Sequence, residues 1–207
     1  MTIEIIAAIL IGYFLGSIPF ALVIGKVFYK KDIRNYGSGN LGGGNAGRVL
    51  GKKAGLAVMT MDILKVTFAI FLISLLTENE NVMILAGLAA AAGHCFPVFA
   101  KFKGGKAVAT SLGVLFATVP LAGVMALVAF FPVVFITRYV SLSSTAATIA
   151  AVLTSFIFYG VIIGDRLYTS FIVLILGLII FIKHIPNYKR LINGTENRFG
   201  RKIAKQE

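Results

Sequence analysis

Long apolar segments separated by short polar ones recur along the whole chain, and this pattern limits the fold more than any other feature. A transmembrane helix needs about 20 consecutive apolar residues. Hydrophobic residues make up 58% of the 207 residues and charged residues 14%, whereas charged residues are about a quarter of ordinary soluble domains. The sequence therefore predicts an all-α integral membrane protein, with one polytopic membrane domain over residues 1–207 and no attached soluble domain.

Seven transmembrane helices are predicted from the positions of the apolar segments. Residues 107–137 carry no charge, a stretch too long for one comfortable crossing and short for two, so we expect Pro120 to separate two short or tilted helices. Glu4 but no Lys or Arg precedes or enters the first apolar segment, which argues against a cleavable signal peptide. The expected spans are 3–25, 54–76, 82–99, 108–119, 120–137, 142–163 and 167–183.

The distribution of Lys and Arg predicts the orientation. With seven spans, 18 of the 20 Lys and Arg residues fall on one side of the membrane, and six spans would scatter them over both sides. The positive-inside rule then places the N-terminus outside and the basic loops and C-terminus in the cytoplasm. The formal charge of +12 is explained by this orientation, so no nucleic-acid partner is expected.

A polar, glycine-rich segment at residues 37–53 interrupts the apolar pattern on the predicted cytoplasmic side. A membrane fold does not require such a segment. Its glycines leave backbone N–H groups able to turn toward an anion, and its hydroxyl, amide and basic side chains add donors and positive charge. The segment therefore predicts a phosphate site. Its polar members include Ser38, Asn40, Asn45, Arg48, Lys52 and Lys53.

Two further polar clusters fall on the same predicted side. In the second, Gly104, Gly105 and Lys106 precede a helix, and the first-turn N–H groups and dipole of a helix favour an anion. His94 lies at the end of the preceding span. Taken by itself, it could equally be a buried structural histidine or a residue of the site. The third cluster comprises His184, Asn187, Lys189, Arg190, Gly194, Thr195 and Glu196.

Asp62 and Lys65 lie three residues apart inside a predicted span, so they can pair on one helix face. Both a structural pair facing the bundle interior and a direct role in the site remain open. Cys95 is the single cysteine, which excludes a disulfide framework and a cysteine-rich metal site. No G-x-S-x-G or H-E-x-x-H motif is present, so we expect neither a metal nor a serine or cysteine acyl-enzyme.

Together the three clusters resemble a known family, the bacterial membrane acyl-phosphate:glycerol-3-phosphate acyltransferases of the PlsY type. The motifs occur in the family's order and spacing, and the resemblance covers nearly the whole chain. The matching residues are Gly37 to Asn45 with Arg48, then Asp62 to Lys65, then Gly93 to Lys106, and finally His184, Asn187, Arg190, Gly194 and Glu196.

The resemblance implies transfer of a fatty acyl group from acyl phosphate to the 1-hydroxyl of glycerol 3-phosphate, at the cytoplasmic face of the bacterial cell membrane. The products would be lysophosphatidic acid and phosphate, with no cofactor. Membrane lipid is the surrounding partner, and the oligomeric state stays open, a monomer included. By the same resemblance, catalytic roles fall on Ser38, Arg48, Lys106, His184 and Asn187, and substrate or phosphate binding on Gly39, Asn40, Gly42, Asn45, His94, Gly104, Gly105, Arg190 and Glu196.

The chain departs from the family pattern at three positions. Gly44 replaces the usual Thr, Ala107 replaces Gly, and Ile185 stands where Arg is frequent. Gly44 removes a hydroxyl, so backbone or water would have to supply its hydrogen bond, and no role is carried onto Gly44 or Ile185. Pro186 is expected to shape the loop ahead of Asn187.

One mechanistic question and two other functions stay open at this point. Histidine has an ordinary pKa that suits a general base, so His184 could accept the proton of the attacking hydroxyl. The departing phosphate could accept this proton equally well. A transporter of an organic phosphate would also need basic, glycine-interrupted helix ends. A scaffold that binds anionic lipid would use the basic tail but leaves the glycine segments unexplained.

Overall fold

The computed structural model describes residues 1–164 and 166–199, and every regular element in these residues is a helix. The described residues form two compact units, 1–113 and 114–199 without 165, which are described separately. Short 3-10 turns lie at Ile33–Asn35 and Val98–Ala100, and a π-helix at Ser155–Ile162 continues α8. The α-helices are α1 (Thr2–Gly16), α2 (Phe20–Tyr29), α3 (Gly43–Val49), α4 (Lys52–Ser74), α5 (Glu80–Cys95), α6 (Val108–Thr118), α7 (Pro120–Thr137), α8 (Val140–Thr154) and α9 (Leu167–Ile192).

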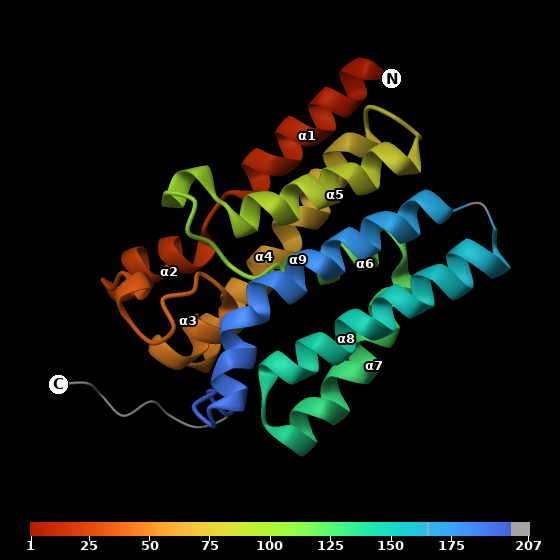
Figure 1. Ribbon diagram of the computed structural model, residues 1–207. Coiled ribbons are helices and arrows are strands. Elements are labelled where there is room, and N and C mark those ends of the chain that lie inside the picture. The colour runs from red at the N-terminus through yellow and green to blue at the C-terminus, as the bar shows by residue number, and fades with distance from the viewer. Residues whose placement is uncertain (165, 200–207) are drawn as a thin grey trace. The chain divides into compact units, whose positions relative to one another are not determined.

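In the first unit, α1 and α5 lie side by side (Figure 1). Small residues permit their close approach, because a Cβ on Gly12 or Gly16 would collide with the backbone of α5. Gly93 of α5 is equally close to the backbone of α1. Contacts between small residues of this kind are typical of helices packed in lipid, where close backbone approach supplies the van der Waals contact. The helix α4 packs against both.

The first apolar segment is two helices, whereas the sequence predicted one span over 3–25. The break lies at residues 17–19, between α1 and α2. Pro19 has no N–H to donate and disfavours the helical conformation of the residue before it. The backbone carbonyl of Ile18 is consequently turned out of the helix, where it accepts a hydrogen bond from Lys65 Nζ at 2.9 Å.

The glycine-rich segment is also more ordered than predicted, because residues 43–49 form α3 rather than loop. Gly42 begins this helix in an extended conformation, and Gly51, at φ 103°, separates it from α4. Gly55 lets α3 and α4 pack with their backbones in contact, since a Cβ on Gly55 would reach within 2.6 Å of the Gly47 Cα atom. The glycines therefore serve packing as well as any ligand.

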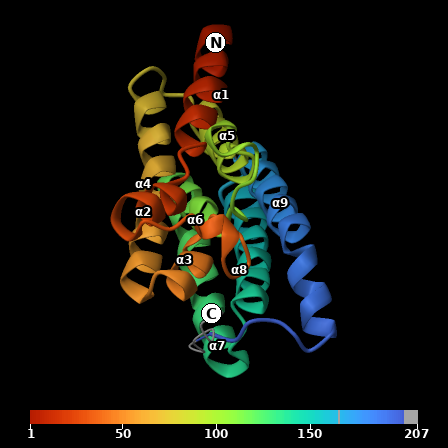
Figure 2. The same cartoon turned by 90° about the vertical axis from the view of Figure 1, so that its left-hand side faces the viewer.

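In the second unit, α7 and α8 pack along each other, as Figure 2 also shows, and α9 packs on α8 and on the π-helix that continues it. Two serines connect α9 to the π-helix, because Ser170 Oγ on α9 donates to the carbonyl of Ser155 on the π-helix at 2.9 Å. The helix α9 continues nine residues beyond the predicted end at 183. His184, Asn187 and Pro186, expected in a loop, therefore lie within its last turns.

Six helical segments of the described residues are long and apolar enough to cross a membrane: Thr2–Tyr29, Lys52–Ser74, Glu80–Ala100, Pro120–Thr137, Val140–Ile162 and Leu167–Ile192. They correspond to six of the seven predicted spans. The remaining span, 108–119, is the helix α6, which has 11 residues. At a rise of 1.5 Å per residue it extends only about 16 Å, roughly half the hydrocarbon thickness.

Candidate functional site

Asn45 organises the glycine-rich segment from inside α3. Its side chain is buried, and Oδ1 accepts the backbone N–H of Ser38 at 2.9 Å. Nδ2 donates to the carbonyls of Ile33 and Tyr36, each at 3.2 Å. These contacts occupy the amide with the backbone of its own segment. We therefore interpret Asn45 as the residue that shapes the loop before α3.

Ser38 and Arg48 are brought together by this folding of the segment. Arg48 Nη2 donates to Ser38 Oγ at 3.3 Å, although ten residues separate them. The guanidinium is half-buried and the serine is exposed. The positive-φ glycines Gly37 and Gly39 flank Ser38. A hydroxyl and a guanidinium presented together can donate to the oxygens of one phosphate.

Arg34, by contrast, is neutralised within its own turn. Asp32 lies beside it, with Arg34 Nη2 2.6 Å from Asp32 Oδ2, and Lys26 Nζ is 3.8 Å from the same oxygen. The hydrogen bond from Arg34 is the main reason that the pKa of Asp32 falls to about 2. The carboxylate thus stays ionised at every physiological pH and stays paired with Arg34. Arg48, by contrast, faces Ser38.

Asn40 connects the first predicted cluster to the second. Its Nδ2 donates to the Gly104 carbonyl at 3.3 Å, across 64 residues of sequence. This bond places the Ser38–Arg48 pair and the Gly104–Lys106 loop within one unit of the structure. Lys106 is half-buried and lies two residues before the start of α6. The first and second clusters are thus in contact through Asn40 and Gly104.

His94 forms the surface against which the second loop packs. Gly105 N donates to the His94 carbonyl at 3.0 Å. A Cβ on Gly105 would overlap Nε2 of the His94 ring, and a Cβ on Gly104 would overlap the His94 carbonyl. Only glycine fits at these two positions. The Gly-Gly pair ahead of Lys106 is therefore explained by contact with His94 in addition to any contact with an anion.

The other side of the His94 ring contacts the predicted Asp62–Lys65 pair. Lys65 Nζ is 2.8 Å from Asp62 Oδ1, and 2% of each side chain is exposed. Lys65 Nζ also lies 3.1 Å from His94 Nδ1. The pair is therefore internal and contacts a residue that supports the Gly104–Lys106 loop. The prediction that Asp62 and Lys65 pair is confirmed.

Glu196 is the centre of the third cluster, within the second unit. Its Oε1 accepts Asn187 Nδ2 at 2.6 Å and Ser141 Oγ at 3.0 Å, and its Oε2 accepts Arg190 Nε at 2.8 Å. Burial raises the pKa of Glu196, but these hydrogen bonds and the Arg190 charge outweigh it, so the pKa lies below its ordinary value. The carboxylate remains ionised and orients Asn187 and Arg190.

His184 lies one turn before Asn187 on α9, and its ring is buried. Its Nδ1 is 2.8 Å from the Ile180 carbonyl. A carbonyl only accepts, so Nδ1 carries a proton, and in the neutral form of the ring Nε2 would be the basic nitrogen. Ser141, which holds Glu196, was not predicted from the sequence. The polar residues of the apolar span 140–154 were a signal for it.

Glu196 should stabilise the fold in a pH-dependent way. Because its pKa is lowered on folding, its contribution is present above the unfolded pKa, near 4.5, and is lost as pH falls through the folded value. Glu196→Gln should therefore lower the free energy of unfolding at pH 7 by about 1.5–3 kcal/mol, the usual contribution of hydrogen bonding to a charged group, and lower the melting temperature accordingly. The difference from wild type should narrow toward pH 4 in a thermal-denaturation series. An equal difference at both pH values would contradict the assigned contacts.

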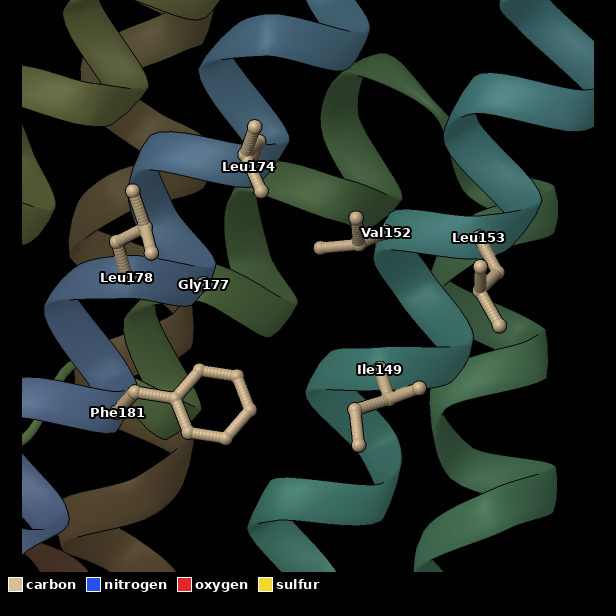
Figure 3. A pocket seen from close by; sticks show the side chains of 7 residues that line it. All are labelled: Ile149, Val152, Leu153, Leu174, Gly177, Leu178 and Phe181. Carbon is tan, nitrogen blue, oxygen red and sulfur yellow. The ribbon is translucent and has the colours of Figure 1, made fainter.

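A small apolar cavity of about 130 Å³ lies between α8 and α9 (Figure 3). Phe181, at one end of it, is three residues before His184 and so shares its helix face. The lining carries no charged side chain and can accommodate hydrocarbon. Among the described residues, no three His, Cys, Asp or Glu side chains gather as metal ligands would. The cavity is lined by Ile149, Val152, Leu153, Leu174, Gly177, Leu178 and Phe181.

Comparison with known proteins identifies the family. The family model described as glycerol-3-phosphate acyltransferase matches residues 6–194. The glycerol-3-phosphate acyltransferase of Bacillus cytotoxicus is 49% identical over 188 residues, which are 91% of each chain. Glycerol-3-phosphate acyltransferase 2 of Bacillus anthracis is 50% identical over 193 residues, covering 93% of this chain and 98% of that one.

A solved structure agrees with the sequence comparison. The crystal structure of PlsY (YgiH), an integral membrane glycerol 3-phosphate acyltransferase, in its glycerol 3-phosphate form, has a TM-score of 0.86 and 39% identity. The match covers 95% of this chain and 96% of that chain. The lysophosphatidic acid form of PlsY gives a TM-score of 0.83 at 38% identity, covering 95% of both chains. The chain therefore belongs to the PlsY family of glycerol-3-phosphate acyltransferases.

Proposed function

We propose that this protein transfers a fatty acyl group from acyl phosphate to the 1-hydroxyl of glycerol 3-phosphate, the first step of phospholipid synthesis. The products are 1-acyl-glycerol 3-phosphate and inorganic phosphate. The observation that carries the proposal is the meeting of two anion-binding segments in one unit, Ser38 with Arg48 and Gly104 to Lys106, joined by Asn40. Relatives named for glycerol 3-phosphate, and a PlsY structure with that molecule, support the acceptor.

The electrostatics of the two segments suit this reaction. Both substrates carry a phosphate, and the attacked carbonyl gathers negative charge while phosphate departs. Fixed donors aimed at developing charge are usually the largest source of rate acceleration in such transfers. In the proposal, Lys106 and the 104–106 backbone hold one phosphate. Arg48, Ser38 and the 39–45 backbone, with Gly39 and Gly42, hold the other, in either order of substrates.

His184 is proposed as the base that accepts the proton of the attacking hydroxyl. The Nδ1–H bond to Ile180 supports this role, because it leaves the basic lone pair on Nε2. Asn187 and Arg190, oriented by Glu196, act in the same reaction. His184→Gln should lower kcat by about 10²-fold or more, in line with the usual contribution of general-base catalysis. A His184→Gln variant that keeps most of its turnover would instead assign the proton to the departing phosphate.

The proposed topology has seven crossings, with the N-terminus outside and the site at the cytoplasmic face of the bacterial cell membrane. Helix α6 has 11 residues and is short for a crossing. A span shorter than the hydrocarbon core is accommodated by local thinning of the bilayer. Such a crossing keeps the basic loops on one side.

The acyl chain of the donor is proposed to use apolar surface on α8 and α9. The cavity of Figure 3 supports this, since its lining is hydrocarbon and Phe181 lies one turn from His184.

The donor is tested by measuring lysophosphatidic acid by mass spectrometry with purified protein and glycerol 3-phosphate. Palmitoyl phosphate, palmitoyl-CoA and palmitoyl-acyl carrier protein are supplied in separate reactions. Product from palmitoyl phosphate alone is expected. Product from either thioester, with none from palmitoyl phosphate, would overturn the proposed donor while leaving the acceptor intact.

A further inference from the structure

The buried ammonium of Lys65 is surrounded by three groups that can receive its three N–H bonds. The Ile18 carbonyl accepts one at 2.9 Å, and His94 Nδ1 lies 3.1 Å away. The Asp62 carboxylate is in ion-pair contact at 2.8 Å. An ammonium group has three donors and no acceptor. The Ile18 carbonyl and the His94 ring are within hydrogen-bond distance of Nζ, and the Asp62 carboxylate is its ion-pair partner. The Phe20 ring, 5.8 Å from Nζ, completes the surroundings.

This arrangement determines which nitrogen of His94 carries the ring proton. An ammonium donor 3.1 Å from Nδ1 requires a lone pair on Nδ1, since two N–H groups facing each other cannot bond. Asp62 Oδ1 lies 3.5 Å from Nδ1, a longer contact than the 3.1 Å to Lys65 Nζ. With Lys65 as the donor, Nδ1 accepts and the ring proton lies on Nε2. Nε2 is the atom that lies against Gly105.

We propose that Lys65, anchored by Asp62 and Ile18, is a positioning residue that locks His94 in its Nε2–H tautomer and orientation and thereby sets the Gly104–Lys106 loop. The chain of contacts runs from the ion pair through the imidazole to the Gly105 backbone, and the loop ends at Lys106. Neither Asp62 nor Lys65 need touch a substrate. The kinetic part of this inference rests on the proposed function, whereas the tautomer can be tested without any activity.

The chain offers an internal control, because His94 and His184 are its only two histidines. The contact with Ile180 gives His184 the opposite tautomer, Nδ1–H. Solid-state NMR of full-length protein in bilayers, with ¹⁵N-labelled histidine, should therefore show one ring of each type. The spectrum of His184→Gln assigns the remaining signals to His94. A His94 ring that is Nδ1–H or doubly protonated in the wild type would overturn the proposal.

Removing the ammonium group of Lys65 should change the tautomer of His94 and leave that of His184 unchanged. Lys65→Met should abolish the preference for Nε2–H at His94 and leave the His184 signals in place. Because a lone buried Asp62 is destabilising, Asp62→Asn/Lys65→Met is the second variant, which removes both charges and should give the same spectral change. An unchanged His94 tautomer in the folded double variant would contradict the proposal.

The functional consequence is measured on the same proteins. Lys65→Met should lower kcat by about 10-fold to 10²-fold, the scale expected when a catalytic group is misplaced by about 1 Å. Lys65→Arg, which keeps a cationic donor, should recover part of this loss. Thr67→Val is the matched control on α4, since Thr67 Oγ1 bonds only locally to the Ile63 carbonyl in the structure, and its turnover should equal wild type.

The two hypotheses fail in distinguishable ways. If the wild type transfers no acyl group at all, the proposed function fails, and the NMR result still decides the tautomer. If Lys65→Met loses the tautomer yet turns over normally, the acyltransferase stands and the positioning role of Lys65 is refuted.

Discussion

Lys106→Ala is expected to lower kcat by about 10²–10³-fold while the protein stays folded. Losing one preorganised donor to developing negative charge has an effect of this size in comparable acyl-transfer sites. Lys106 follows the Gly104–Gly105 pair and precedes the first turn of α6. The side chain should thus add a positive charge beside the backbone donors of this loop. Initial rates under saturating substrate, with monodispersity checked by size-exclusion chromatography, measure the effect.

The control for Lys106→Ala is Lys101→Met. Lys101 is an exposed lysine five residues earlier, in the turn after Val98–Ala100. It therefore tests whether the loss of any positive charge in this region is sufficient to lower kcat. Its rate should match wild type. Arg48→Ala should resemble Lys106→Ala, because Arg48 is the cation facing Ser38. A monodisperse Lys106→Ala protein with near-normal turnover would remove Lys106 from the phosphate site.

Gly105→Ala is expected to lower kcat by about 10²-fold, although it adds a single methyl group. That methyl would occupy the position of His94 Nε2. The ring cannot turn aside easily, because Lys65 and the neighbouring Asp62 hold its other edge. The loop backbone must therefore shift, and a displacement of about 1 Å at a catalytic group has consequences of this order. Steady-state kinetics should show the loss mainly in kcat.

Gly47→Ala is the matched control for Gly105→Ala. A Cβ at position 47 would lie 3.6 Å from the nearest atom, the Gly55 Cα, which is ordinary van der Waals contact. Its turnover should be unchanged, because the added methyl group fits without displacing the backbone. If Gly105→Ala were as active as Gly47→Ala, the loop would not depend on its contact with His94.

The membrane spans were predictable from sequence because hydropathy reports burial in lipid directly. Six of the expected spans correspond to long apolar helical segments. Breaks within the helical segments were harder to predict from the sequence. Pro19 divides the first segment, while Pro186 lies inside α9 without ending it. The same residue type gives opposite outcomes because packing and hydrogen bonding around the turn decide whether a helix continues. Periodicity does not carry that information.

The candidate site was predictable as a set of residues and less so as a set of roles. Gly-rich and basic motifs identified the two segments that Asn40 joins. The supporting roles of Asn45 and Glu196 depend on hydrogen bonds to partners that sequence spacing does not reveal. The same holds for His94, whose contacts with Lys65 and Gly105 come from three separate segments. Roles that arise from tertiary contacts required the structure.

Phosphate release from palmitoyl phosphate, measured with and without glycerol 3-phosphate, tests the central claim most directly. Detergent-purified wild-type protein and Lys106→Ala are compared in the same assay. The account predicts release that requires glycerol 3-phosphate and falls by about 10²–10³-fold in the variant. Absence of release by well-folded wild-type protein, or release that is independent of glycerol 3-phosphate, would contradict the proposed acyl transfer.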